Sequence, residues 1–119
     1  MSVAVEVDEE VNHLPAGVAL CFYRVVQEAL NNASKHGKAL AAEVTAKRVG
    51  EIIRLTIKDF GIGFDPLEQG NSSGIGLVSM RERARAIDGT LVVHSTRGFG
   101  TEVIAEVGYL PARADLETG

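Results

Sequence analysis

Apolar residues follow two different periods in the first third of the chain. Between residues 3 and 7 three valines alternate with other side chains, a period of two that predicts a short strand with one buried face. From Val18 to Ala33 apolar residues recur every three or four positions, as they do along one face of a helix. Pro15 and Gly37 bracket this stretch and are typical of a helix start and stop. We therefore expect a helix over about residues 15–36.

Two β-prone segments and a long loop come next. Residues 42–49 and 52–59 are separated by Gly50 and Glu51, which predicts a hairpin with a two-residue turn. Residues 60–76 are rich in glycine, proline, asparagine and serine. A loop of about fifteen residues is long enough to suggest a functional role.

The remainder of the chain repeats the order of a helix followed by a hairpin. A second helical stripe begins at Leu77 and continues to Ile87, and strands are expected at residues 90–95 and 101–107. Helices that alternate with hairpins in this way indicate the α+β class.

Length and charge narrow the range of functions. A chain of 119 residues makes one domain, which the periodic pattern places at residues 3–107, with a tail at residues 108–119. It carries 12 Lys+Arg against 16 Asp+Glu, a net charge of −4, so general attraction to nucleic acid or anionic lipid is not expected. The longest mostly apolar stretch, residues 14–23, is about half of a membrane span. With one cysteine and no signal-peptide pattern, a cytoplasmic domain is expected.

Glycines are concentrated where a ligand would approach the backbone. Eight of the thirteen glycines lie between Gly61 and Gly100, and glycine permits close contact and positive φ. This clustering suggests a nucleotide pocket. No glycine precedes the Lys-Ser/Thr pair of a P-loop, and neither Gly-x-Gly pair has the third glycine of a dinucleotide fingerprint. An Asp-Phe-Gly triplet occurs at residues 59–61, without the other motifs of protein kinases.

The first helix carries a polar stripe beside its apolar face. Glu28, Asn32 and Lys35 are spaced four and three residues apart, so a carboxylate, an amide oxygen and an ammonium are expected at one cleft. Mg²⁺ takes one or two protein oxygens together with substrate phosphates, and a nearby lysine neutralises phosphate charge. The stripe is therefore compatible with Mg-nucleotide, and equally with an ordinary solvated helix face.

Asp59 ends a predicted strand and is followed by Gly61 and Gly63. A carboxylate held there could accept a hydrogen bond from an adenine amino group while the backbone closes around the base. The same spacing also occurs in simple turns.

Gly74, Ile75, Gly76 and Leu77 lead directly into the second helix. A helix N-terminus flanked by glycine offers free N–H groups and a favourable dipole to phosphate oxygens. A flexible loop that ends in a helix start would have the same sequence.

Taken together, four segments resemble a known family. Residues 28–36, 59–63, 74–77 and 98–101 resemble, in order, the N, G1 and G2 boxes and the terminal Gly-Thr element of bacterial sensor histidine kinases. Residues 76–84 look like the subfamily whose partners are LuxR-type response regulators. The resemblance implies the Bergerat fold, an α+β two-layer sandwich with a mixed, mostly antiparallel sheet covered on one face by helices. It also implies ATP and Mg²⁺ as ligands.

The resemblance also implies roles for single residues. By this analogy Glu28 would polarise a water molecule, the short loop at residues 65–73 would be the ATP lid, and Asn32 would ligate Mg²⁺. The ATP-binding positions would be Asn32, Lys35, His36, Asp59, Gly61, Gly63, Gly74, Ile75, Gly76, Leu77 and Thr101.

The family transfers phosphate to a histidine on a dimeric helical hairpin, and none of His13, His36 and His94 suits that role. We therefore expect a catalytic domain that binds Mg-ATP and donates its γ-phosphoryl group to a histidine-bearing dimerisation domain. A LuxR-type response regulator would then act downstream. Two alternatives stay open: a single-domain anti-sigma factor serine kinase, and a nucleotide-binding module without transfer activity.

Overall fold

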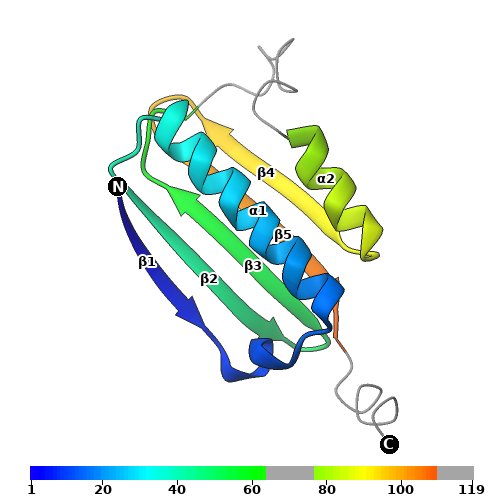
Figure 1. Cartoon of the computed structure of the whole chain (residues 1–119). Helices are drawn as coiled ribbons and strands as arrows, with labels where there is room; N and C mark the ends of the chain where they lie inside the picture. The colour runs from blue at the N-terminus through cyan, green and yellow to red at the C-terminus, as the bar shows by residue number, and fades with distance from the viewer. Residues whose placement is uncertain (64–76, 110–119) are drawn as a thin grey trace, which may run out of the picture.

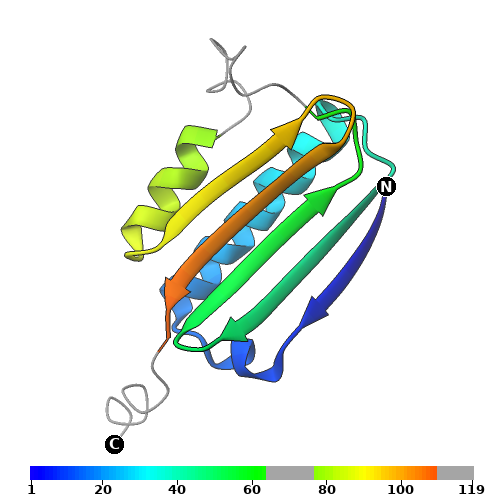
Figure 2. The same ribbon diagram turned by 180° about the vertical axis from the view of Figure 1, so that it is seen from behind.

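The chain folds into two layers, a five-stranded sheet and a layer of helices on one of its faces (Figures 1 and 2). The computed structural model describes residues 1–63 and 77–109. In chain order the elements are β1 (Ser2–Val7), the 3-10 helix η1 (Glu9–His13), α1 (Ala16–Lys35), β2 (Ala41–Val49), β3 (Ile52–Asp59), α2 (Leu77–Ala86), β4 (Thr90–Thr96) and β5 (Gly100–Gly108).

The sheet is mixed and mostly antiparallel. Its strand order is β1-β2-β3-β5-β4, and only the β1–β2 pair is parallel, which requires α1 as the crossover between those strands. The other pairs are antiparallel. The β2–β3 hairpin turns between Val49 and Ile52, where Gly50 adopts a φ of 62°. These observations confirm the predicted α+β sandwich, with the sheet covered on one face.

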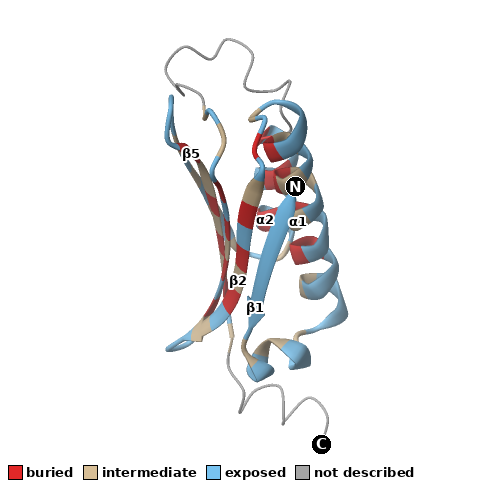
Figure 3. Cartoon of the chain, turned by 90° about the vertical axis from the view of Figure 1, so that its left-hand side faces the viewer, coloured by how far each residue is buried: buried red, intermediate tan, exposed pale blue. Residues whose placement is uncertain are grey.

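The core lies between the helices and the inner face of the sheet (Figure 3). Alternate residues of the three middle strands point inward, as the period of two requires. Their side chains meet the apolar faces of α1 and α2, and the buried cluster includes Phe22, Val25, Ala29, Val44, Ile53, Leu55, Ile57, Leu77, Met80, Val103 and Ala105.

The prediction of a buried face on the first strand is wrong. All six residues of β1 are exposed, including Val3, Val5 and Val7 at 39%, 66% and 47%. The register places these valines on the same face as the buried residues of β2. Burial nevertheless fails because α1 lies over the middle strands and leaves the outer edge uncovered (Figure 1).

The predicted helix boundaries agree closely with α1. The helix ends where the His36 and Gly37 N–H groups both donate to the Asn32 carbonyl, each at 2.9 Å. At the far end of the chain, β5 includes Gly108, and Tyr109 N–H donates to the Glu51 carbonyl at 2.7 Å. β5 therefore ends one residue beyond the predicted domain boundary. Most of the predicted loop and the rest of the tail lie outside the described residues. No helix of the described part is long and apolar enough to span a membrane.

Candidate functional site

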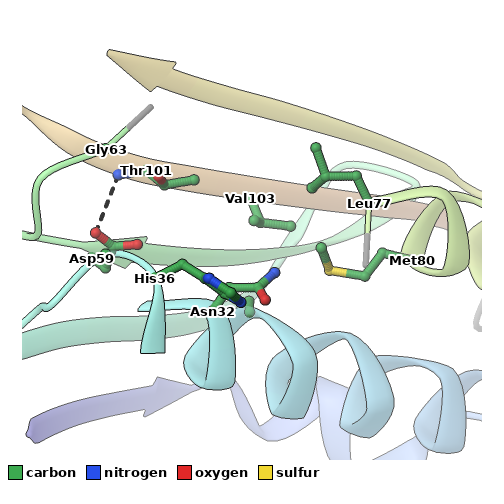
Figure 4. Close-up of a pocket in the computed structure, with 10 residues that line it drawn as sticks. Asn32, His36, Asp59, Gly63, Leu77, Met80, Thr101 and Val103 are labelled. Atoms are coloured by element: carbon green, nitrogen blue, oxygen red, sulfur yellow. Dashed lines mark hydrogen bonds between the residues drawn. The ribbon is translucent and has the colours of Figure 1, made fainter. Parts of the chain in front are cut away.

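A pocket opens between the two helices at one end of the sheet (Figure 4). It has about 650 Å³ of empty space, part of it open to solvent. Its walls come from the C-terminal half of α1, the end of β3, β5 and the start of α2. The lining residues are Ala29, Asn32, His36, Gly37, Asp59, Gly63, Leu77, Met80, Thr101 and Val103.

Asp59 is the buried polar residue of this pocket, at 7% exposure. It is the last residue of β3, the middle strand of the sheet. Its Oδ1 accepts hydrogen bonds from the Gly61 N–H at 2.9 Å and from the Thr101 N–H at 3.3 Å. Among the described residues no group donates to Oδ2. Because Oδ1 is held by two backbone donors, the carboxylate is fixed and Oδ2 stays available to a ligand.

Glycine lets the chain pass close to this carboxylate. At Gly100 the φ is 88°, and a Cβ there would collide with the backbone carbonyl oxygen of Asp59. A Cβ on Gly61 would collide with the Gly37 carbonyl oxygen in the same way. The loss of these glycines would therefore move the strands or the helix end that position Asp59.

Backbone hydrogen bonds join three segments around the pocket. The Ile62 N–H donates to the Gly37 carbonyl at 2.8 Å, which ties the segment after β3 to the end of α1. The Gly98 N–H donates to the Ile62 carbonyl at 2.6 Å, which ties that segment to the β4–β5 turn. The end of α1, the end of β3 and the turn therefore form one continuous wall.

Thr101 is also supported through its side chain. Its Oγ1 lies 2.8 Å from the Ser95 Oγ on the neighbouring strand β4, so the two hydroxyls share a hydrogen bond. Ser95 additionally approaches the Gly100 carbonyl at 3.3 Å. This network fixes the Thr101 side chain beside Asp59 (Figure 4).

The polar stripe predicted on α1 reaches the pocket in part. Asn32 and His36 are lining residues, one helical turn apart. Glu28 is half-buried and Lys35 is exposed, and neither is among the described residues that line the pocket. We expected Glu28, Asn32 and Lys35 to share one cleft. Of these three residues, only Asn32 lines the pocket in the described part of the chain.

The predicted glycine positions are divided by what the structure describes. Gly63 and Leu77 line the pocket, and Gly61 bonds to the Asp59 carboxylate beside it. Gly74, Ile75, Gly76 and the predicted lid at residues 65–73 lie outside the described residues.

Sequence reasoning missed four lining residues that are apolar or small: Ala29, Gly37, Met80 and Val103. Ala29 and Met80 belong to helical stripes that the pattern assigns to the core, and they do belong to it. A signal was available, since an alanine where a core stripe would carry a larger side chain leaves space. This apolar floor suits a flat, hydrophobic ligand.

The described residues contain no group of three or more His, Cys, Asp or Glu side chains placed to hold a metal ion. A resident metal cage is therefore absent from this part of the chain. Magnesium that arrives with phosphates is a different case, because it needs only one or two protein oxygens. Asn32 carries a side-chain amide at the pocket wall.

Cys21 lies in the N-terminal half of α1, where that helix faces α2, and does not line the pocket. Its Sγ donates to the Arg83 carbonyl of α2 at 3.3 Å, which links the two helices. Burial raises the pKa of the Cys21 thiol, and the positive charge of Arg83 opposes that rise in part. The thiol therefore stays protonated near neutral pH.

Comparison with known proteins supports this description. Residues 17–112 match the model of the histidine kinase-, DNA gyrase B-, and HSP90-like ATPase family. The chain is 38% identical over 93 residues to the signal transduction histidine-protein kinase/phosphatase DegS of Brevibacillus brevis, covering 78% of this chain. It is 36% identical over 109 residues to the sensor histidine kinase LiaS of Bacillus subtilis, covering 92% of this chain.

A solved structure shows the same fold. The blue-light activated histidine kinase EL346 of Erythrobacter litoralis matches 99% of this chain with a TM-score of 0.74 at 22% identity. The match takes in 37% of that kinase chain. Likewise, the chain spans 24% of the length of DegS and 30% of the length of LiaS.

Proposed function

Because the chain belongs to the histidine kinase-, DNA gyrase B-, and HSP90-like ATPase family, we propose that it is the catalytic, ATP-binding domain of a sensor histidine kinase. It binds Mg-ATP and donates the γ-phosphoryl group to a histidine of a separate dimerisation domain. The observation that carries this proposal is the buried carboxylate of Asp59, which has one oxygen held by the backbone and one available at an apolar pocket.

Adenine fits the chemistry of this pocket. The flat base buries its ring against the apolar floor formed by Ala29, Met80 and Val103. Its exocyclic amino group donates to the Asp59 Oδ2, and the Thr101 hydroxyl, held by Ser95, supports the polar edge. A base without that amino group would leave a buried charge unpaired, which costs roughly 1–3 kcal/mol. Gly61 and Gly63 let the backbone close around the base.

Further residues of the pocket wall are suited to the phosphates. Asn32 offers an amide oxygen to Mg²⁺, and His36 lies one turn further along α1. Leu77 is at the first turn of α2, where free N–H groups and the helix dipole favour negative charge. Residues 74–76 lead into this turn and belong to the same proposed phosphate site. Lys35 would reach phosphate, and Glu28 would orient a water molecule, from positions just outside the described lining.

Transfer of the phosphoryl group would depend on positioning and charge neutralisation, as phosphoryl transfer generally does. The bond between the γ-phosphorus and the β,γ-bridging oxygen breaks, a phosphorus–nitrogen bond forms, and ADP leaves. Of the described histidines, His13 ends η1 and His94 lies on an edge strand. Neither lines the pocket, and His36, which does, belongs to the proposed nucleotide site, so we assign the acceptor to another domain. The resemblance of residues 76–84 supports our proposal of a LuxR-type regulator as the downstream partner.

The test has two stages. Magnesium-dependent binding of a fluorescent ATP analogue to the purified domain is the first expected result, and its absence at millimolar nucleotide would refute the proposal. In the second stage, labelled ATP is mixed with this domain and a histidine-bearing dimerisation domain. An acid-labile, base-stable phosphoprotein is expected, because phosphohistidine is lost in acid. An acid-stable product would indicate a serine kinase, and binding without any transfer would indicate a nucleotide-binding module.

A further inference from the structure

The edge of the sheet carries an apolar strip without a cover. The strip consists of Val3, Val5 and Val7, which are 39%, 66% and 47% exposed. Each is paired in register with a residue of β2 that is at most 6% exposed, namely Ala42, Val44 and Ala46. The strip therefore lies on the helix-bearing face of the sheet, where neighbouring strands are buried and β1 is not.

The space beside α1 has the width of one helix. The helix packs mainly on β3, and β1 lies two strands away in the sheet order. Two strand spacings amount to about 9.6 Å, and packed helices have axes about 8–10 Å apart. A helix above β1 would thus be at the normal packing distance from α1. Figure 1 shows this part of the sheet uncovered by the ribbon, and Figure 3 shows β1 exposed along its length.

The side of α1 that faces this space is also apolar. Cys21 lies on the side of α1 that faces α2. Val26 is five residues further along, about 140° around the helix, so it lies on the side of α1 that faces away from α2. Val26 and Leu30 are only partly buried, and Tyr23 is 61% exposed. The space is therefore lined by apolar side chains on its floor and on one wall.

Edge-to-edge pairing with a second copy of this chain would not fill the space. Two β1 edges could pair side by side, but this would widen the sheet and leave both rows of valines without a covering layer. The missing element is a helix, because only a second layer buries the inner face of a sheet.

We propose that an amphipathic helix covers this strip, with apolar residues spaced i, i+3, i+4 and i+7, and that it comes from the kinase polypeptide on the N-terminal side of Met1. In DegS and LiaS most of the polypeptide lies outside the part that matches this chain. β1 has six residues, which span about 20 Å at 3.3 Å each. A helix of about 13 residues has that length.

The direction of the helix follows from its attachment. A helix that leads into Met1 must end at the start of β1, so it runs antiparallel to β1 and parallel to α1. Its first turn then lies near η1, where Glu9 is exposed. An acidic side chain at that end interacts favourably with the positive end of the helix dipole.

The experiment joins a designed 14-residue amphipathic helix to Met1 through a short Gly-Ser linker. The control carries the same residues in an order that destroys the apolar face. Urea unfolding should show at least a tenfold larger folding constant for the amphipathic fusion, about 1.4 kcal/mol. Val5→Lys should remove this gain, while Val92→Lys, on the opposite edge strand and 46% exposed, should not.

Two further measurements keep the outcomes separate. Amide exchange of β1 should slow in the amphipathic fusion only, which detects docking even where Val5→Lys changes basal stability. Equal stability of the two fusions would overturn the proposal. Light scattering that shows a dimer of the unfused chain, disrupted by Val5→Lys, would also overturn it in favour of a second copy. None of these readouts depends on nucleotide binding.

Discussion

Replacing Asp59 with asparagine tests base recognition with little change in shape. In the native chain Oδ1 accepts from two backbone N–H groups at 2.9 and 3.3 Å. The same two donors should hold the amide oxygen of Asp59→Asn, because an amide nitrogen there would face two N–H groups. The Nδ2 is thus forced into the position of Oδ2, where an acceptor becomes a donor.

The magnitude follows from that exchange. The variant loses a hydrogen bond from the adenine amino group to a charged acceptor and places two donors opposite each other. Such a change costs about 1–3 kcal/mol, so the Kd for ATP should rise about 5- to 150-fold. Inosine triphosphate has a carbonyl in place of the amino group. It should bind the native carboxylate weakly and should recover affinity in the variant.

The assay is displacement of a fluorescent ATP analogue by ATP and by inosine triphosphate. Glu43→Gln removes the same charge from an exposed position on β2 and should leave both affinities unchanged. A thermal melt shows that the Asp59→Asn domain is folded at the assay temperature. If the preference for ATP over inosine triphosphate were the same in the native chain and in the variant, Asp59 would not read the base.

Three more outcomes are expected. Gly100→Ala should destabilise the fold by about 1–3 kcal/mol more than Gly98→Ala, since both φ angles are near 88° but only Gly100 has a backbone oxygen in the way; equal urea midpoints would contradict this. Asn32→Ala should weaken the magnesium dependence of ATP binding, measured by titration, while the exposed neighbour variant Asn31→Ala should not. Burial raises the pKa of Cys21, so iodoacetamide should react slowly at pH 8 until urea unfolds the chain, and native stability should fall as pH rises above about 8.5. Rapid alkylation of the native thiol would contradict a raised pKa of Cys21.

Local signals in the sequence were sufficient for the α-helices and the strands, but they did not predict the 3-10 helix η1. The boundaries of α1 follow from a proline at its start and Gly37 at its end, and the β2–β3 turn follows from Gly50. The failure at β1 has a different cause. Alternation of valines reports which face of a strand is apolar, and burial depends on a second layer that no local pattern contains. The sequence thus identified the apolar face of β1 correctly and its environment wrongly.

The site was predictable to a similar extent. Asp59 and Asn32 were identified by residue type and spacing, and the structure brings both to one pocket. Glu28 and Lys35 are not among the described lining residues because of how α1 is rotated about its axis against the sheet. The helical period of 3.6 predicts this rotation too coarsely to say which neighbouring side chain enters the pocket. Met80 and Val103 went unrecognised as lining residues because core packing and a pocket floor require the same apolar side chains.

The location of Asp59 on the middle strand has a consequence for how the domain fluctuates. β3 has a partner strand on each side over residues 52–58, and Asp59 follows directly with its carboxylate held by two backbone N–H groups, so this segment should open less often than helix ends and turns. The group assigned to select the base would then be among the slowest-moving parts of the molecule. Selectivity for the base would then not depend on local opening of the nearby helix ends and turns.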